Sequence, residues 1–305
     1  MGNPKFAVQT LDVLYNDENF DLKLVVSSKD KKRSRNKVTP TEVKKYAMDH
    51  GIEVATPDSV NTKEFVDELK ALDIDFIVVV AFGQIIGDLL LEEFNDRIIN
   101  LHPSILPKYR GAAPMQFTLL NGDKETAPTT MLIEKGMDSG DILMQEIVEV
   151  PSDFDYYDLE EKMSELGSDA IRRTLLDFDN IYKNRIKQDD SKATYTSKIS
   201  KDMGQIDWTN DSETIYNQVR ALIAFPKAFF KYEGNNVKVI RAKIRDDYKA
   251  NPGYIYEADP KSNIIIGTGN GAIEITKLQF PGKKAMDTIA FLAGNEFKKG
   301  ISLNE

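Results

Sequence analysis

The sequence contains no cysteine, only two histidines and a single tryptophan among its 305 residues. Without cysteine the chain can form no disulfide, no cysteine-ligated zinc site and no thiol nucleophile. It lacks any apolar run of about 18 residues, so no segment is predicted to span a membrane. The first residues, Met1 to Lys5, lack the apolar core of a signal peptide. These absences together favour a cytoplasmic protein.

The charge is negative in total but unevenly distributed. The net charge is -9, of which residues 1–200 carry -11 and residues 201–305 carry +2. Two segments are basic, because Lys29–Lys37 has six Lys/Arg against one acid and Lys183–Lys201 has six against two. Such a segment is commonly a solvated loop, although clustered positive charge is also what binds a phosphate backbone. Both interpretations stay open for each segment.

Helical and strand patterns alternate through the first 150 residues. The helical segments are Phe6–Tyr15, Thr41–His50 and Thr62–Leu72, and the strands are Leu22–Val26, Ile52–Ala55, Phe76–Val80 and Ile98–Leu101. Phe76–Val80 is a continuous apolar run, which is typical of a strand buried on both faces. The alternation predicts an α/β fold with a Rossmann-like, mostly parallel sheet and flanking helices. Ligands in such sheets bind beyond the carboxyl ends of the strands.

The pattern changes in the second half of the chain. Two strands are predicted on either side of the turn Gly136–Gly140, and a long helix over Asp155–Asp179. Later come short strands at Val237–Ile244, Gly253–Tyr256, Ile264–Gly267 and Ile273–Leu278, with Gly267–Gly271 as a hairpin turn rather than a phosphate loop. We therefore expect a domain over 1–182, a basic linker over 183–203 and a small OB-like β-barrel over 204–305.

Asn100 and His102 lie near the carboxyl end of a predicted strand. They are two residues apart, so an extended backbone directs both side chains to the same face. An amide can hydrogen-bond a carbonyl oxygen that becomes negative, and an imidazole can hold a proton near neutral pH, which suits acyl transfer. A histidine with a structural hydrogen bond is the other interpretation of His102. His50 precedes Gly51 at the predicted end of a helix, where it is unremarkable.

Asp138 lies in a glycine-flanked turn, where the backbone can approach a ligand closely. It could orient His102 or accept a proton through water, or it could be an ordinary turn aspartate. Asp141 follows three residues later, but the set of His102, Asp138 and Asp141 has no recognised metal-ligand spacing. We therefore expect no metal.

The segment Asn100–Pro114 (NLHPSILPKYRGAAP) resembles the signature of the folate-dependent formyltransferases. Its RGAAP ending is most similar to the branch of that family that formylates methionyl-tRNA. The resemblance continues through Met137–Asp141, Ala193–Tyr195, Ile206–Trp208 and Pro281–Met286, so it covers nearly the whole chain in order.

This resemblance implies a set of site residues by position. Asn100, His102 and Asp138 match the family's catalytic residues. The segments matching the folate pocket comprise Phe82, Gly83, Gln84, Ile85, Ser104, Ile105, Leu106 and Pro107. The first basic segment matches a loop that reaches towards the tRNA acceptor stem, which implies tRNA contacts from Lys31, Lys32, Arg33, Arg35 and Lys37. Residues 1–182 would then be the catalytic domain and 204–305 the tRNA-binding domain.

The implied reaction transfers the formyl group of 10-formyltetrahydrofolate to the α-amine of methionyl-initiator tRNA, for translation initiation. The amine attacks directly, Asn100 and protonated His102 stabilise the oxyanion, and Asp138 positions His102. The expected partners are initiator tRNA and reduced folate, with no membrane, and we expect a monomer. Two alternatives are a formyltransferase acting on a small amine, such as a purine precursor or an amino sugar, and an RNA-binding relative without catalysis.

The beginning of the chain departs from the family pattern. Members usually open with an apolar strand before a Gly-Thr-Pro-x-Phe-Ala motif, whereas here only Met1 precedes Gly2–Ala7 (GNPKFA). The first strand is therefore predicted to be missing, which would leave an unpaired edge in a parallel sheet. A misassigned start would explain this more simply than a deletion. The basic loop also lacks the prolines and glycines common at that place.

Overall fold

The computed structural model describes residues 1–32 and 38–303, and contacts divide the chain into two compact units. The first unit comprises Met1–Pro114, Glu125–Glu149 and Glu160–Thr196, and the second comprises Met115–Lys124, Val150–Leu159 and the chain from Ser197 onward. Within the described residues, no helix has both the length and the apolar character needed to cross a membrane.

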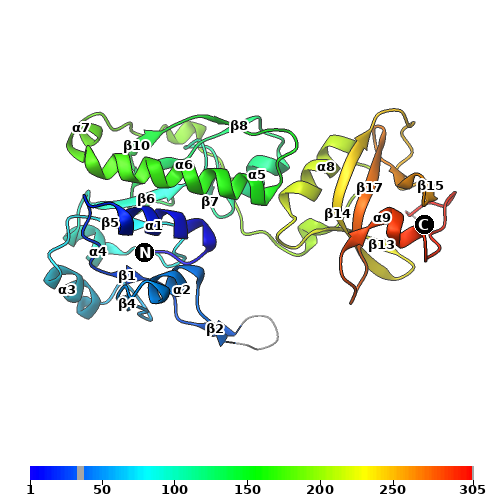
Figure 1. Ribbon diagram of the computed structural model, residues 1–305. Helices are drawn as coiled ribbons and strands as arrows, with labels where there is room; N and C mark the ends of the chain where they lie inside the picture. The colour runs from blue at the N-terminus through cyan, green and yellow to red at the C-terminus, as the bar shows by residue number, and fades with distance from the viewer. Residues whose placement is uncertain (33–37, 304–305) are drawn as a thin grey trace. The chain divides into compact units, whose positions relative to one another are not determined.

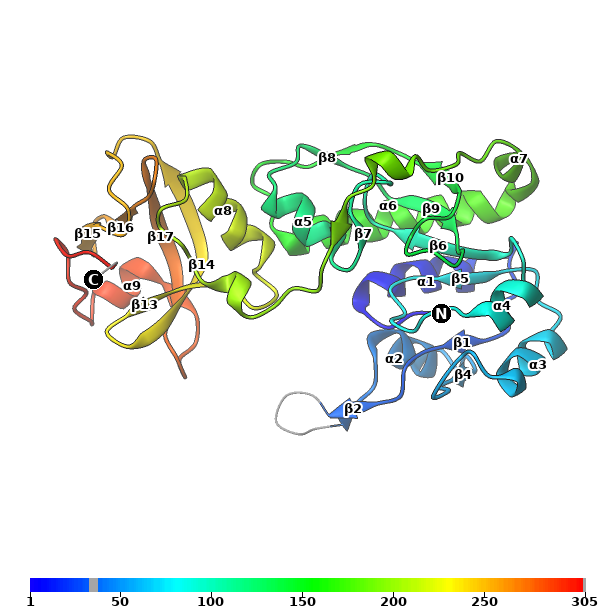
Figure 2. The same cartoon turned by 180° about the vertical axis from the view of Figure 1, so that it is seen from behind.

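The first unit is built on parallel strands. Its main strands are β1 (Val25–Val26), β4 (Val54–Ala55), β5 (Ile77–Val79), β6 (Ile98–His102), β9 (Thr129–Leu132) and β10 (Ile142–Gln145). β1 pairs with β4 and β5 with β6 in parallel, whereas β9 and β10 continue the second of these sheets antiparallel, in the order β10-β9-β6-β5 (Figure 2). Short antiparallel pairs join β2 (Lys31–Lys32) to β3 (Val38–Thr39) and β8 (Glu125–Thr126) to β11 (Val148–Glu149).

Helices flank these strands, so the predicted α/β class is confirmed. They are η1 (Lys5–Ala7), α1 (Val8–Asn16), α2 (Glu42–Asp49), α3 (Lys63–Ala71), α4 (Asp88–Glu93), α6 (Tyr156–Leu176) and α7 (Phe178–Lys183). Thr41 and Thr62 begin α2 and α3 by accepting hydrogen bonds from backbone N–H groups three residues on. α6 runs alongside β6 (Figure 1), and a Cβ at Gly167 would lie 2.6 Å from the Leu101 side chain, so glycine permits this approach.

Met1 and Gly2 lie between β1 and β5. The Met1 amine donates to the Val78 carbonyl at 2.6 Å, and the Val80 amide donates to the Met1 carbonyl at 2.9 Å. Gly2 forms a parallel bridge with Val80, and its N–H donates to the Val26 carbonyl at 3.0 Å. A cavity of about 600 Å³ lies beside them, lined partly by β1 and β5. Two residues therefore connect β1 and β5 at the place where the sequence predicts a missing strand.

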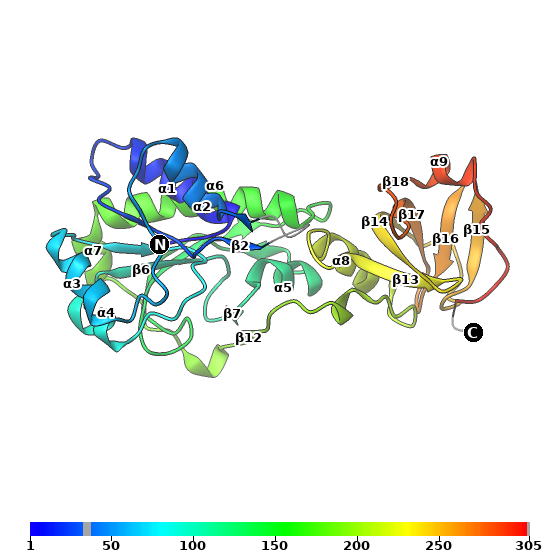
Figure 3. The ribbon, with the colours of Figure 1, turned by 90° about the horizontal axis from the view of Figure 1, so that it is seen from below.

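The second unit contains an antiparallel sheet, in the part of the chain where the sequence predicts a small OB-like β-barrel. Its strands are β13 (Ala228–Tyr232), β14 (Asn235–Arg245), β15 (Ile255–Asp259), β16 (Asn263–Gly267), β17 (Ala272–Gln279) and β18 (Met286–Asp287), and its helices are α5 (Pro114–Leu120), α8 (Ser212–Ala221) and α9 (Thr288–Leu292). The strand order is β13-β14-β17-β16-β15, with β18 beside β17 (Figure 3). Thr268–Gly271 joins β16 to β17 as a hairpin, which confirms the prediction.

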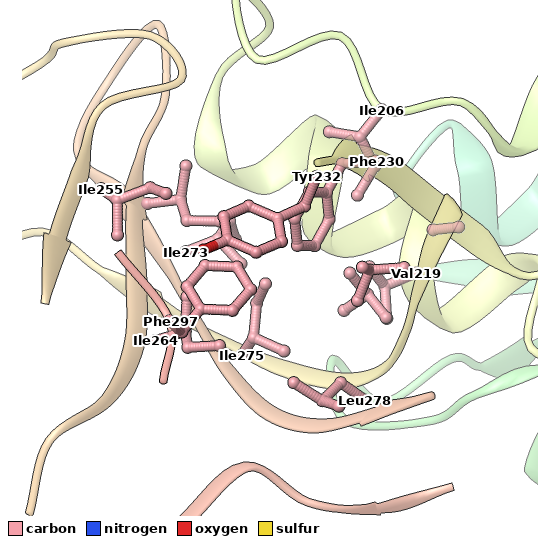
Figure 4. Packing of buried hydrophobic residues seen from close by; sticks show 14 of the residues in the cluster. Ile206, Val219, Phe230, Tyr232, Ile255, Ile264, Ile273, Ile275, Leu278 and Phe297 are labelled. Atoms are coloured by element: carbon pink, nitrogen blue, oxygen red, sulfur yellow. The ribbon is translucent and has the colours of Figure 1, made fainter. Parts of the chain in front are cut away.

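One apolar core fills this unit (Figure 4). Side chains from the strands, from α8 and from the segment after α9 converge in it, including Val219, Phe230, Tyr232, Ile255, Ile264, Ile273, Ile275, Leu278 and Phe297. The rings of Tyr232 and Phe297 stack with centroids 3.8 Å apart, and Trp208 packs edge-on against Phe230. Burial of these large side chains is the main source of the unit's stability.

Replacing Phe230 by alanine tests this core. Phe230 is 2% exposed, so Phe230→Ala should lower the free energy of unfolding by roughly 3–5 kcal/mol. Urea unfolding followed by the fluorescence of Trp208, the single tryptophan, measures the loss. Phe229→Ala is the control, because Phe229 is only half-buried and lies on the opposite face of β13. Equal losses in the two variants would contradict this assignment of the core.

Candidate active site

Strand β6 carries Asn100 and His102 on one face. Asn100 pairs in register with Val79 of β5 and with Met131 of β9, and His102 pairs with Thr129 of β9. Side chains two residues apart on a strand point to the same side, so the amide and the imidazole share a face near the carboxyl end of β6. His102 is buried at 4% exposure, and Asn100 is half-buried.

The two ring nitrogens of His102 have different surroundings. Nε2 lies 2.9 Å from the Tyr109 carbonyl oxygen, and Nδ1 lies 3.7 Å from Oδ2 of Asp138. A carbonyl only accepts hydrogen bonds, so Nε2 carries a hydrogen and Nδ1 is the nitrogen that gains or loses a proton. The 3.7 Å separation exceeds a hydrogen bond, so Nδ1 makes no direct hydrogen bond to Asp138.

Asp138 is held in the Gly136–Gly140 turn in a left-handed backbone conformation, with φ of 47°. Its Oδ2 accepts a hydrogen bond of 2.7 Å from the backbone N–H of Gly111. Gly111 has φ of 103°, and a Cβ there would lie 2.7 Å from the Thr196 carbonyl oxygen. The N–H can reach Asp138 because residue 111 has no side chain. Gly111 therefore orients the carboxylate that faces His102.

The segment around Gly111 is held by residues far along the chain. β7 (Arg110–Gly111) pairs in parallel with β12 (Tyr195–Thr196). Arg110 is 2% exposed, and its guanidinium donates to Oε1 of Gln188 at 3.0 Å and to Oδ1 of Asp190 at 2.7 Å. Burial alone would lower the pKa of Arg110, but hydrogen bonds to Asp190 and Tyr195 raise the pKa above its usual value. The sequence placed Arg110 within the signature segment Asn100–Pro114 but gave it no role, and it did not single out Gln188, which has no local signal.

The segment after β5 has one buried and two exposed positions. Phe82 belongs to the apolar core, whereas Gly83 is exposed and Ile85 is 84% exposed. Gln84 is half-buried, and its side-chain oxygen accepts from the backbone N–H of Val60 at 3.1 Å. The exposed positions are therefore the ones whose atoms a ligand could contact.

The loop after β6 is fixed by internal hydrogen bonds. Ser104 is fully buried, its hydroxyl donates to the Lys108 carbonyl at 2.6 Å, and its carbonyl accepts from the Thr129 hydroxyl at 2.7 Å. Leu106 is buried, while Ile105 and Pro107 are half-buried. These hydrogen bonds hold the loop in place, and Ile105 and Pro107 are its partly exposed side chains.

The remaining residues singled out from the sequence lie elsewhere. Lys31 and Lys32 form β2, and Arg33, Arg35 and Lys37 lie outside the described residues. The carboxylate of Asp141 accepts a hydrogen bond of 2.9 Å from Arg185. Within residues 1–32 and 38–303, no cluster of three His, Cys, Asp or Glu side chains is arranged to hold a metal ion.

Two family models match this chain. One, described as formyl transferase, matches residues 1–175, and the other, described as formyl transferase, C-terminal domain, matches residues 198–296. The first match alone covers more than half of the chain. The chain therefore belongs to the formyl transferase family.

Several proteins within this family are similar to the chain over nearly its whole length. The chain is 42% identical to the methionyl-tRNA formyltransferase of Finegoldia magna, over 99% of this chain and 97% of the relative. It is 37% identical to the methionyl-tRNA formyltransferase of Halothermothrix orenii, over 99% and 98% of the two chains. Among solved structures, WlaRD, a sugar 3N-formyl transferase, has a TM-score of 0.65 at 23% identity, covering 93% of this chain and 97% of that one. The last similarity shows a shared fold.

Adding a methyl group at Gly111 tests the packing of the site. Gly111→Ala should lower the free energy of unfolding by about 2 kcal/mol or more, because the new Cβ meets a backbone oxygen and the φ is unfavourable. Gly234→Ala is the matched control, since Gly234 has φ of 76° but nothing within 4 Å, and should cost about 1 kcal/mol. Denaturant unfolding measures both. A loss at Gly111 no larger than that at Gly234 would argue against the close approach to Thr196.

Proposed function

We propose that this chain transfers the formyl group of 10-formyltetrahydrofolate to the α-amine of methionyl-initiator tRNA. His102 and Asp138, whose nearest polar atoms are 3.7 Å apart, are the observation that carries the proposal, because an imidazole beside a carboxylate suits proton movement during acyl transfer. The match to methionyl-tRNA formyltransferases over 99% of the chain supports this acceptor over a small amine. The reaction takes place in the cytoplasm, where translation begins.

The chemistry needs no covalent intermediate with the protein. The neutral amine attacks the formyl carbon, a new C–N bond forms, and the carbonyl oxygen becomes negative. Asn100 and the Nδ1–H of protonated His102 stabilise this oxyanion. The bond from the carbon to N10 of the folate then breaks as the carbonyl reforms, and the amine's proton passes to N10 with the help of Asp138 through water. Asp138 also stabilises the protonated imidazole of His102.

We assign acceptor binding to the second unit and to the basic segment Lys29–Lys37. The second unit presents Lys231, Lys238, Arg241 and Lys277 on the face of β13, β14 and β17 opposite the core. The register places Phe229 and Gln279 on either side of Lys238, whereas their sequence neighbours Phe230 and Leu278 are buried. A cluster of cations on one sheet face suits a phosphate backbone. We define these four residues as the basic face.

Replacing His102 tests the reaction centre. His102→Ala should lower kcat for formylation of methionyl-tRNA by roughly 100- to 1,000-fold, because it removes a hydrogen-bond donor to the oxyanion. Binding of the charged tRNA at fixed salt should stay near the wild-type level. Turnover is measured with 10-formyltetrahydrofolate as donor, and free methionine as acceptor checks that the tRNA is required.

His50→Ala is the matched control for this variant. His50 is the other histidine, it is exposed, and its ring stacks on Tyr46 at a centroid distance of 4.0 Å. Its loss should leave turnover unchanged. Near-normal formylation by His102→Ala would refute the assigned reaction centre, and preference for a free amine over charged tRNA would refute the assigned acceptor.

Neutralising the basic face tests acceptor binding. The double variant Lys238→Gln, Arg241→Gln should bind tRNA more weakly and lower the slope of log affinity against log salt by roughly 1 for each phosphate that is no longer neutralised. The kcat at saturating tRNA should change little. Lys249→Gln is the control, because Lys249 is exposed and lies in the loop between β14 and β15, outside the strands of this face. An unchanged salt slope in the double variant would place the acceptor elsewhere.

A further inference from the structure

Asp138 needs support for its backbone as well as for its side chain. Its φ of 47° lies in the left-handed region, which a residue with a Cβ adopts at some energetic cost. Such a conformation persists where surrounding contacts determine it. The hydrogen bond from the Gly111 N–H orients the Asp138 carboxylate, but the carboxylate faces His102 only if the backbone of the turn also stays in place.

Gln188 provides this support from 50 residues away in the sequence. Its Nε2 donates to the carbonyl oxygen of Asp138 at 2.9 Å and to that of Gly140 at 2.7 Å. An amide nitrogen has two hydrogens, so both are used on the same turn. Gln188 is 6% exposed, and water therefore competes little for these bonds. One side chain thus holds both ends of the segment from Asp138 to Gly140.

Arg110 fixes which way the Gln188 amide points. Its Nε donates to Oε1 of Gln188 at 3.0 Å. If the amide were reversed, its NH₂ would face the guanidinium and its oxygen would face two carbonyl oxygens, so that arrangement is excluded. Arg110 is itself held by Asp190 from the solvent side. The chain of bonds therefore runs from Arg110 through Gln188 to the backbone of Asp138.

The geometry points to Gln188 as a positioning residue that sets the place of Asp138 relative to His102 during formyl transfer. This inference rests on the proposed function and adds a residue that touches neither substrate nor the reacting atoms. Such positioning matters for the rate, because an error of about 1 Å in the placement of a catalytic group can cost on the order of 100-fold in rate.

Two substitutions of Gln188 distinguish its hydrogen bonds to the turn from its hydrogen bond to Arg110. Gln188→Met has a similar length and removes every polar interaction of the side chain. Gln188→Glu keeps an acceptor for Arg110, so the buried guanidinium stays paired, but it removes both donors to the turn and places a carboxylate oxygen against the two carbonyl oxygens. We expect kcat to fall on the order of 100-fold in both variants, with the KM for charged tRNA and for 10-formyltetrahydrofolate nearly unchanged.

Gln218→Met is the matched control. The Nε2 of Gln218 also donates to two backbone carbonyl oxygens, those of Met203 at 2.8 Å and Gln205 at 3.0 Å. The substitution therefore removes the same kind of hydrogen bond in the second unit, remote in sequence from the catalytic turn. Its kcat should stay close to that of the wild-type enzyme. Urea unfolding of all variants checks that the assays compare folded proteins.

The outcomes distinguish this inference from the function on which it rests. Wild-type enzyme that does not formylate methionyl-tRNA would overturn the proposed function itself. An active wild type with an undiminished kcat in Gln188→Glu would overturn only the positioning role. An equal fall of kcat in Gln218→Met, or a rise in KM with kcat unchanged, would also overturn it, because the effect would then reflect stability or binding.

Discussion

The first unit depends on one buried charge, the guanidinium of Arg110. It is 2% exposed and bonds to Gln188 and Asp190, which come about 80 residues later in the chain. A buried cation without its partners is strongly destabilising. The chain from Gln188 to Thr196 must therefore dock against β7 for this unit to be stable. The same segment supplies the Gln188 amide that bonds to the catalytic turn.

Much of the fold could be predicted, because it depends on residues that are close together in the sequence. The apolar run at Phe76–Val80 predicts a buried strand, and β5 is found within it. The spacing of Asn100 and His102 predicts a shared face of a strand, and β6 includes both residues. The hairpin at Thr268–Gly271 has the turn residues that its geometry needs. Each of these features involves residues that are neighbours in the sequence, so periodicity and turn chemistry are sufficient.

The rest could not be predicted, because it depends on contacts between distant residues. Gln188 lies in a polar, lysine-rich stretch with no periodicity, and nothing in that stretch indicates that its amide bonds to a turn 50 residues earlier. β13 begins beside a proline and a lysine with positive φ, which obscures its strand pattern. Met1 and Gly2 bridge β1 and β5 through backbone atoms alone, which side-chain patterns do not reveal.

These contacts together determine which ring nitrogen of His102 faces Asp138. Its Nε2 is used by the Tyr109 carbonyl, so proton exchange is left to Nδ1, which faces Asp138. The position of Asp138 is set by the N–H of Gly111 on its carboxylate and by the Gln188 amide on its backbone. Neither contact involves a group that titrates near neutral pH. The groups that position Asp138 beside the imidazole are therefore a backbone N–H and a neutral amide, whose hydrogen-bonding roles do not change near neutral pH.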